Sequence, residues 1–216
     1  MIVLQIDSYE PYHIGSKLNP ATNFDILKSR LKEKLGAAGY STKSEPQDEE
    51  NYLIKNPIEI LATKNNTKIE LNKIAEALNV IGTKPENVSE IFKEVMDILT
   101  DLEYEIENLV VIFEVLATII VKTDDKPLNV LNQTVSIDSN SFPVNDVQNW
   151  GVTGIRLGGE NRLKNTLFNV MIEPNPTSQN TKFRAKLQYQ SREKENVQTF
   201  FENLDLKIIN LMKQLG

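Results

Sequence analysis

The 216-residue chain contains no cysteine and a single histidine, His13. The absence of cysteine excludes disulfides, thiolate nucleophiles and cysteine-based metal sites. A metal site built from histidines needs more than one, and a catalytic triad would need partners that the spacing around His13 does not supply. We therefore expect a histidine in a surface loop, no bound metal and no cofactor.

Long apolar segments are also missing. The longest, from Leu109 to Val121, is too short for a membrane helix and carries Glu114 near its middle. Met1 leads directly into an apolar segment without the basic residues that open a signal peptide, so we expect a cytoplasmic protein. With 40% hydrophobic and 25% charged residues, the composition is that of a globular protein with a sizeable core.

The chain has no excess of positive charge, because its net charge is −6. Residues 1–107 hold 12 Lys and Arg against 19 Asp and Glu, a net charge of −7, and residues 108–216 hold 12 against 11, a net charge of +1. This balance disfavours non-specific binding of nucleic acid, which depends on cations that neutralise phosphates. Four of the five arginines lie in the second half, however, so nucleic-acid binding through that half stays an alternative.

The clearest positive feature is a repeat. Glu86-Asn87-Val88 begins an amphipathic helix, and Glu195-Asn196-Val197 begins another with the same apolar spacing, 109 residues later. At the same offset, the apolar run from Ile2 to Ile6 matches the run from Val111 to Val115, each with a polar residue at its fourth position. The repeat predicts two halves of similar structure.

Two further matches lie between these anchors. Gly36 to Gly39 corresponds to Gly151 to Gly154 at an offset of 115 residues. Asn66-Thr67-Lys68 corresponds to Asn180-Thr181-Lys182 at an offset of 114. The drift in offset requires insertions, which loops tolerate. We interpret the chain as two fused pseudo-repeats that form a single globular unit.

The pseudo-repeats, residues 1–107 and 108–216, each read as strand, helix, strands and helix. The apolar periodicity predicts helices over Asn23–Leu35, from Pro85 to about Leu102, and from Glu195 to about Leu215. Residues 72–82 fit either a helix or a strand. The expected strands are Ile2–Asp7, Thr67–Leu71, Leu109–Val121, Val130–Ile137, Val152–Leu157, Leu167–Ile172 and Phe183–Tyr189. The predicted class is α+β, with internally duplicated β-α-β(n)-α halves that form one curved antiparallel sheet with helices packed on one face.

This duplicated element order resembles the TATA-box-binding-protein-like fold, a curved antiparallel sheet of two pseudo-symmetric halves with helices on its convex side. The resemblance covers the whole chain in element order, without the strand and turn motifs of that family. Members that bind DNA insert phenylalanine pairs into the minor groove. Phe113 and Phe168 would be the candidates here, but Glu114 and the acidic first half would repel phosphate. The resemblance therefore implies a fold and not a function.

Two groups of polar residues are candidates for chemistry. Gln5 and Glu114 interrupt apolar runs, and they would approach each other if the first strands meet at a pseudo-two-fold axis; the alternative is that both face outward. A second group alternates with apolar residues and would form an acidic strand edge or hold a divalent cation, although no calcium-binding loop is present. Its members are Asp101, Glu103, Glu105 and Glu107.

We predict a non-catalytic binding protein for an unknown protein or ligand, which uses the open sheet face or an exposed edge. The alternatives are a nucleic-acid-binding protein and a small-ligand carrier or carboxylate-based enzyme with a pocket between helices and sheet. The apolar seam of the terminal helices would serve a homodimer or, as we prefer, packing on the sheet. The candidate contact residues are Gln5, Glu114, Arg156, Arg184 and Tyr189.

Overall fold

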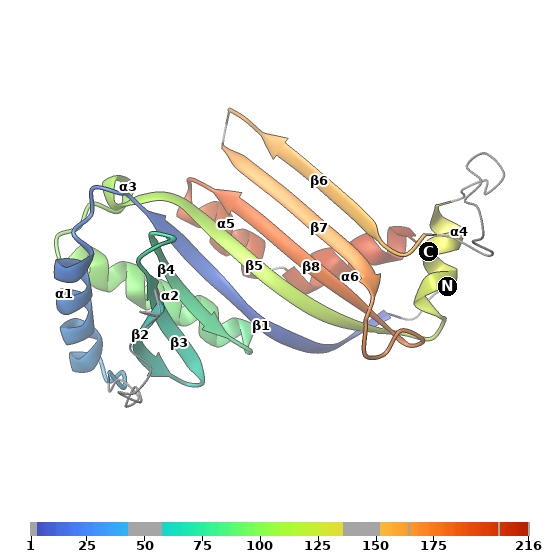
Figure 1. The fold of residues 1–216 in the computed structure, drawn as a ribbon, viewed down its shortest axis with the longest axis horizontal. Helices are drawn as coiled ribbons and strands as arrows, with labels where there is room; N and C mark the ends of the chain where they lie inside the picture. The colour runs from blue at the N-terminus through green and yellow to red at the C-terminus, as the bar shows by residue number, and fades with distance from the viewer. Residues whose placement is uncertain (1–3, 43–57, 136–151, 164, 203, 216) are drawn as a thin grey trace.

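The computed structural model describes residues 4–42, 58–135, 152–163, 165–202 and 204–215. They form an α+β protein with one open eight-stranded antiparallel sheet and six helices (Figure 1). The strand order is β2-β3-β4-β1-β5-β8-β7-β6. The strands are β1 (Leu4–Leu18), β2 (Ile58–Lys64), β3 (Thr67–Asn72), β4 (Ala77–Gly82), β5 (Val110–Thr123), β6 (Ile155–Asn161), β7 (Thr166–Pro174) and β8 (Lys182–Ser191).

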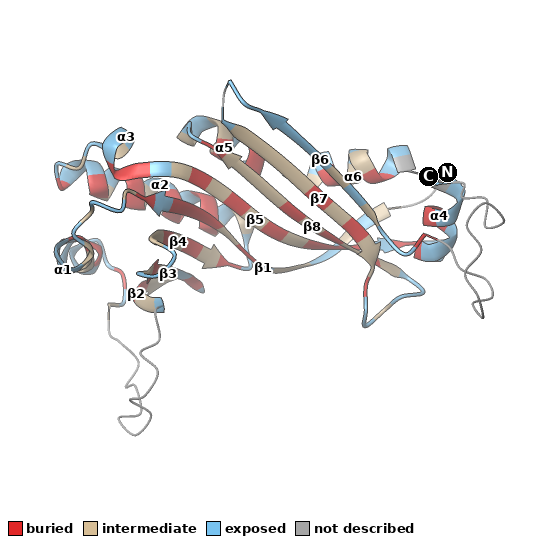
Figure 2. Cartoon of the chain, turned by 45° about the horizontal axis from the view of Figure 1, so that its top comes forward, coloured by how far each residue is buried: buried red, intermediate tan, exposed pale blue. Residues whose placement is uncertain are grey.

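Helices cover one face of this sheet. In Figure 1, α2, α5 and α6 lie behind the strands, which leaves the face toward the viewer open. Burial alternates along the strands accordingly: in β5, Phe113 and Val115 are buried while Glu114 and Leu116 are half-exposed (Figure 2). The helices are α1 (Phe24–Ala37), α2 (Pro85–Asp101), α3 (Ile106–Leu109), α4 (Pro127–Thr134), α5 (Lys194–Glu202) and α6 (Leu204–Leu215).

The long strands β1 and β5 pair with each other at the centre of the sheet. Val88, Phe92 and Val95 of α2 and Val197 and Phe201 of α5 are buried in one apolar cluster with both strands. Residues of both halves thus share a single core. The apolar seam of the terminal helices packs on the sheet, as the sequence predicted.

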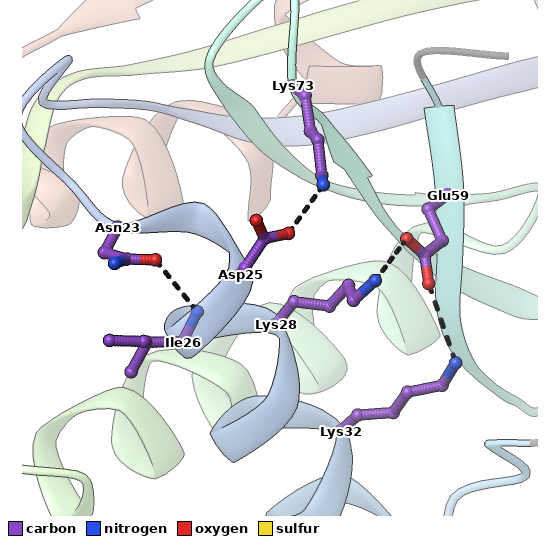
Figure 3. Close-up of polar contacts among 7 residues, drawn as sticks. All are labelled: Asn23, Asp25, Ile26, Lys28, Lys32, Glu59 and Lys73. Carbon is purple, nitrogen blue, oxygen red and sulfur yellow. Dashed lines mark hydrogen bonds and ion pairs between the residues drawn. The ribbon is translucent and has the colours of Figure 1, made fainter. Parts of the chain in front are cut away.

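Helix α1 begins as its sequence predicts and packs beside the edge strand β2. The side chain of Asn23 caps the helix by accepting a hydrogen bond from the backbone N–H of Ile26, at 3.1 Å (Figure 3). Lys28 and Lys32 of α1 both form ion pairs with Glu59 of β2, at 3.0 and 3.7 Å. The helix therefore stays close to β2 on the covered face of the sheet.

Two successive asparagines form the turn between β2 and β3. Asn65 and Asn66 both have positive φ angles, 51° and 58°. Asparagine tolerates this left-handed conformation, and two such residues in succession are typical of a tight hairpin. Residues 72–82 form a turn followed by β4, because the side chain of Asn72 accepts hydrogen bonds from the backbone of Ile74 and Ala75.

Two predicted strand segments are wrong. Residues 130–134 belong to α4, since Pro127 occupies its first turn, where a missing N–H costs nothing, and Val130 and Leu131 are buried. The acidic residues Asp101 to Glu107 do not form an extended edge. They lie in the end of α2, a turn in which Glu103 has a φ of 65°, and α3. Residues 136–137 of the predicted strand Val130–Ile137 lie outside the described residues. So does the segment Pro143–Trp150, which we predicted to form at most a short helix.

Strand β1 is longer than the short strand Ile2–Asp7 that we predicted, and this changes the position of the histidine. His13 lies within β1, where its register partners are Leu116 of β5 and Ile81 of β4. The prediction of a loop histidine is therefore wrong. Pro11 and Gly15 are residues typical of turns, but β1 continues through both. Pro11 lies at a register shift between Glu10 and His13, and Gly15 lies opposite Glu114.

In the described part of the chain, no helix has both the length and the apolar character needed to cross a membrane.

Candidate functional site

The open face of the sheet carries a hydrogen-bonded polar cluster around Glu114. The side-chain amides of Gln188 and Gln190 on β8 each donate a hydrogen bond to the same carboxylate oxygen, Oε1, at 2.7 Å. Gln190 is the register partner of Glu114, and Gln188 lies two residues away along β8, on the same face. The carboxylate is thus held in a fixed position on the face that no described helix covers.

Gly15 lies opposite Glu114 on the other side, in β1. A Cβ atom at Gly15 would come within 2.6 Å of Oδ1 of Asn79, which faces it from β4. The missing side chain therefore leaves the space over Gly15 to the Asn79 amide. As a result, the polar row continues from Glu114 toward β4 without an apolar residue between them.

His13 borders this row. Burial lowers the pKa of its imidazole below the usual 6.5, and the negative charge of Glu114 opposes part of that effect. Burial also raises the pKa of Glu70 on β3, and the charge of nearby Lys68 opposes this. Both side chains are half-buried, so the open face is partly shielded from water even without a covering layer.

A shallow hollow of about 310 Å³ lies next to Glu114 on the same face. Leu116 of β5 and Met171 of β7 give it apolar character, while Gln188 of β8 and Asn169 of β7 contribute amides. Arg156 of β6 lies at its edge and donates a hydrogen bond from Nε to Oδ1 of Asn169, at 3.2 Å. The hollow thus combines an apolar surface with hydrogen-bonding groups, the usual composition of a binding site.

Apart from Arg156, three cations near the hollow are bound to carboxylates. Lys186 pairs with Glu173 at 2.9 Å, and Arg184 pairs with Glu10 at 2.6 Å. At the end of β8, Lys182 pairs with Asp7 at 2.7 Å, and its hydrogen bond lowers the pKa of that carboxyl group. The open face is therefore a mosaic of neutralised charges and is not a positively charged surface.

The structure brings together some of the predicted contact residues. Glu114 and Arg156 flank the hollow. Arg184 lies on the same face, two residues from Lys186 along β8. Tyr189 lies on the opposite face, where its ring stacks on Phe200 of α5 at a centroid distance of 4.3 Å. It is part of the helix-covered packing and does not contribute to the open face.

Gln5 also faces outward, but far from Glu114. Its register partner is Lys122, eight residues along β5 from Glu114, about 26 Å at the usual rise of a strand. The expectation that Gln5 and Glu114 approach each other is therefore wrong. Both lie on the open face. They are far apart because β1 and β5 pair antiparallel, which places the starts of the two strands at opposite ends of the pair.

Further hollows lie outside the open face, and two of them carry several charged residues. The larger, about 660 Å³, is bordered by α3, the start of β5 and the segment before α5, and charged residues of both signs line it. The second, about 360 Å³, lies between the first turns of α2 and the junction of α5 and α6. Four carboxylates line this second pocket: Glu86, Glu90, Glu202 and Asp205.

Two of the four carboxylates of the second pocket have side-chain partners. Glu202 pairs with Lys93 at 2.9 Å, and Asp205 accepts a hydrogen bond from the hydroxyl of Tyr9, whose pKa burial raises far above its usual value. Glu86 and Asp205 lie in the first turns of helices, where a negative charge is stabilised by the helix dipole. Among the described residues no group of three or more acidic or histidine side chains is arranged to hold a metal ion.

The sequence did not single out Asn169 and Gln188, which form the polar rim of the hollow. Gln188 lies within the predicted strand Phe183–Tyr189, but it was not among the candidate contact residues. Amides carry no charge and occur on any surface, so only the strand register shows that they meet Glu114 and Arg156. Comparison with family models, curated proteins and solved structures finds no match to this chain.

Proposed function

We propose that the chain is a non-catalytic binding protein whose contact surface is the open face of the sheet around Glu114 and the adjacent hollow. The observation that carries the proposal is the one-sided cover: the helices pack on one face, and the other presents an ordered mixture of apolar and amide groups. Protein-binding surfaces have this composition, with apolar contacts between hydrogen-bonding groups.

A protein or peptide partner fits this face better than a nucleic acid. Binding of nucleic acid needs cations that are free to neutralise phosphates. Arg184, Lys186 and Lys182 are instead paired with carboxylates on other strands of the sheet, so a phosphate would have to displace these carboxylates. The ion pair of Arg184 with Glu10 therefore counts against a nucleic-acid surface on this face.

The test compares variants in capture of partners from an extract of the cells that make the protein. Leu116→Arg and Met171→Arg place a charge in the hollow, and Leu206→Arg is the matched control on α6, where the side chain is 65% exposed. We expect both hollow variants to lose the same bound protein and the control to retain it. Equal capture by all three variants, with unchanged unfolding midpoints, would contradict the proposal.

The nucleic-acid alternative has its own measurement. Fluorescent single- and double-stranded oligonucleotides are titrated with the protein at about 50 mM salt, where phosphate contacts are strongest. We expect no saturable binding. Binding that weakens steeply as salt is added would replace the protein-partner proposal by the nucleic-acid one.

A small cationic ligand is a second candidate, and the pocket between α2 and the α5–α6 junction favours it. Its four carboxylates face one ammonium group, that of Lys93, and the buried Ser89 lies among them. An organic diamine would satisfy this excess of negative charge. Calorimetric titration with 1,4-diaminobutane tests it, with Glu90→Gln as the variant expected to weaken binding; no measurable heat would exclude this ligand class.

We also infer that the halves arose by duplication and share a pseudo-two-fold arrangement. The strand order supports this, since β1 to β4 and β5 to β8 follow mirrored positions outward from the central β1–β5 pair. One sequence anchor does not fit. Asn66-Thr67-Lys68 leads into the third strand of its half, whereas Asn180-Thr181-Lys182 leads into the fourth. The support therefore comes from topology and from the 109-residue offset at β1, β5, α2 and α5.

A further inference from the structure

The two edges of the sheet differ in how they are protected. At the β2 edge, a register shift lies between Ile60 and Ala62, and the backbone of Ser41 exchanges two hydrogen bonds with Thr63, at 3.0 and 2.9 Å. Irregular pairing and a covering segment are the usual ways in which proteins block an edge strand. Helix α1 adds its ion pairs to Glu59 beside the same strand.

Among the residues that the structure describes, none of these protections is found at the β6 edge. Its pairing with β7 runs through seven consecutive residue pairs without a register shift. β6 contains no proline, and Gly158, Gly159 and Glu160 are exposed. In the described part of the chain no other strand lies beyond β6, so β6 is an edge strand of the sheet.

The residues of β6 are complementary to a second, antiparallel copy of themselves. In a pairing centred on Gly158, Arg156 of each copy lies opposite Glu160 of the other, and Leu157 lies opposite Gly159. Side chains directly opposite each other have Cβ atoms about 5 Å apart, close enough for ion pairs. A Cβ atom added at Gly159 would meet nothing within 4 Å, so the space opposite Leu157 is open.

Both charged residues can take part without losing the fold. Arg156 uses Nε for its bond to Asn169, which leaves its terminal amino groups to donate. Glu160 is bound by Arg162 at 2.8 Å, but the Arg162 side chain is 87% exposed, and such pairs contribute little. Moving the centre of the pairing by one residue separates Arg156 from Glu160, so the charges select one register.

We propose that two copies of this chain associate through antiparallel pairing of their β6 strands, centred on Gly158, into one continuous sheet. The two-fold axis is then perpendicular to the sheet, and the open faces of both copies lie on the same side. The contact is smaller than a standard interface of about 1,200–2,000 Å², so we expect a reversible dimer with a Kd on the order of tens of μM. This dimer does not depend on the function proposed above.

The first test is sedimentation velocity of the full chain from about 5 to 300 μM, a range that brackets this Kd. We expect the wild type to shift from monomer to dimer. Arg156→Glu and Glu160→Arg each place like charges opposite each other and are expected to weaken the dimer at least about tenfold. Arg162→Glu is the matched control, since it reverses a neighbouring exposed charge outside β6 and leaves the dimer intact.

Mixing provides the decisive measurement. In an equimolar mixture of Arg156→Glu and Glu160→Arg, each glutamate of one chain faces an arginine of the other, so a heterodimer forms although neither variant dimerises alone. The double variant carrying both changes regains the homodimer for the same reason. A wild type that stays monomeric, a dimer insensitive to these reversals, or a mixture that stays monomeric overturns the proposal.

A crosslinking experiment keeps the native charges and needs no charge variant to fold. Because the chain has no cysteine, Gly158→Cys introduces a single thiol directly opposite its copy in the proposed dimer. We expect an oxidant to trap a disulfide-linked dimer. Leu163→Cys is the control, since this side chain is 98% exposed and lies beyond the paired strand. Equal crosslinking of both variants, or none at Gly158→Cys, contradicts the pairing.

Discussion

Replacing Tyr12 by phenylalanine is expected to stabilise the protein. The Tyr12 side chain is 1% exposed, and its hydroxyl has no hydrogen-bond partner among the described residues. Its ring contacts the rings of Tyr9 and Phe201, at centroid distances of 5.7 and 5.4 Å, and phenylalanine retains both contacts. A buried hydroxyl without a partner costs about 1–3 kcal/mol, and deleting one oxygen leaves only a small cavity. We expect the free energy of unfolding to rise by about 1 kcal/mol.

Tyr40→Phe deletes the same oxygen atom in a different setting and serves as the matched control. The Tyr40 hydroxyl donates a hydrogen bond to Glu94, which also pairs with Lys64 at 2.8 Å. A hydrogen bond to a charged group contributes about 1.5–3 kcal/mol. Because the Glu94 side chain is partly exposed and keeps Lys64, we expect the lower end of this range, a loss of about 1.5 kcal/mol.

Urea unfolding at pH 7, followed by circular dichroism, measures the free energy of unfolding of each variant, and thermal unfolding measures its Tm. For a protein of this length, 1 kcal/mol corresponds to a change in Tm of roughly 2–4 °C, so the two variants should shift Tm in opposite directions. A loss of stability of about 1 kcal/mol or more in Tyr12→Phe would refute the reasoning, since it would mean that the hydroxyl has a partner in solution. Equal slopes in urea are required for the comparison to hold.

Two further predictions concern a glycine and the histidine. A Cβ atom at Gly82 would lie 2.9 Å from a buried methyl group of Val88, so Gly82→Ala is expected to lower the free energy of unfolding by about 1–3 kcal/mol, whereas Gly159→Ala in open space should leave it nearly unchanged, both by urea titration. Burial lowers the pKa of His13, so the unfolded chain binds more protons below pH 6.5, and stability should fall as the pH drops from 7.5 through the folded pKa. NMR titration of this single imidazole measures the pKa, and His13→Gln should remove this part of the pH dependence; an imidazole that titrates above 6.5 would contradict the assignment.

The elements with regular apolar periodicity were predictable from the sequence. Helix α2 has a proline in its first turn and an apolar stripe through Phe92 and Leu99, and β5 is a run of β-branched and other apolar residues. Both patterns report burial on one side of a single element. The antiparallel sheet was predicted from the order of these elements along the chain.

Helix α4 was missed because its apolar residues are few and adjacent. Val130 favours strands, and Leu131 beside it gives no helical spacing. The structure places both in a helix whose apolar side is buried in the core. The candidate site was missed for a different reason. Glu114 was visible as a polar interruption, but its partners Gln188 and Gln190 are about 75 residues away and are fixed by strand register alone.

The unequal charge of the two halves has a structural counterpart at the centre of the sheet. Asp7 and Glu10 on β1 are acidic residues of the first half, and their partners Lys182 and Arg184 on β8 are cations of the second. Both ion pairs cross over β5, which separates the two strands. Each pair contributes little free energy where it is exposed. Their value lies in specificity, because a displaced β1 would place its carboxylates beside apolar residues such as Ile120 and leave the β8 cations without partners.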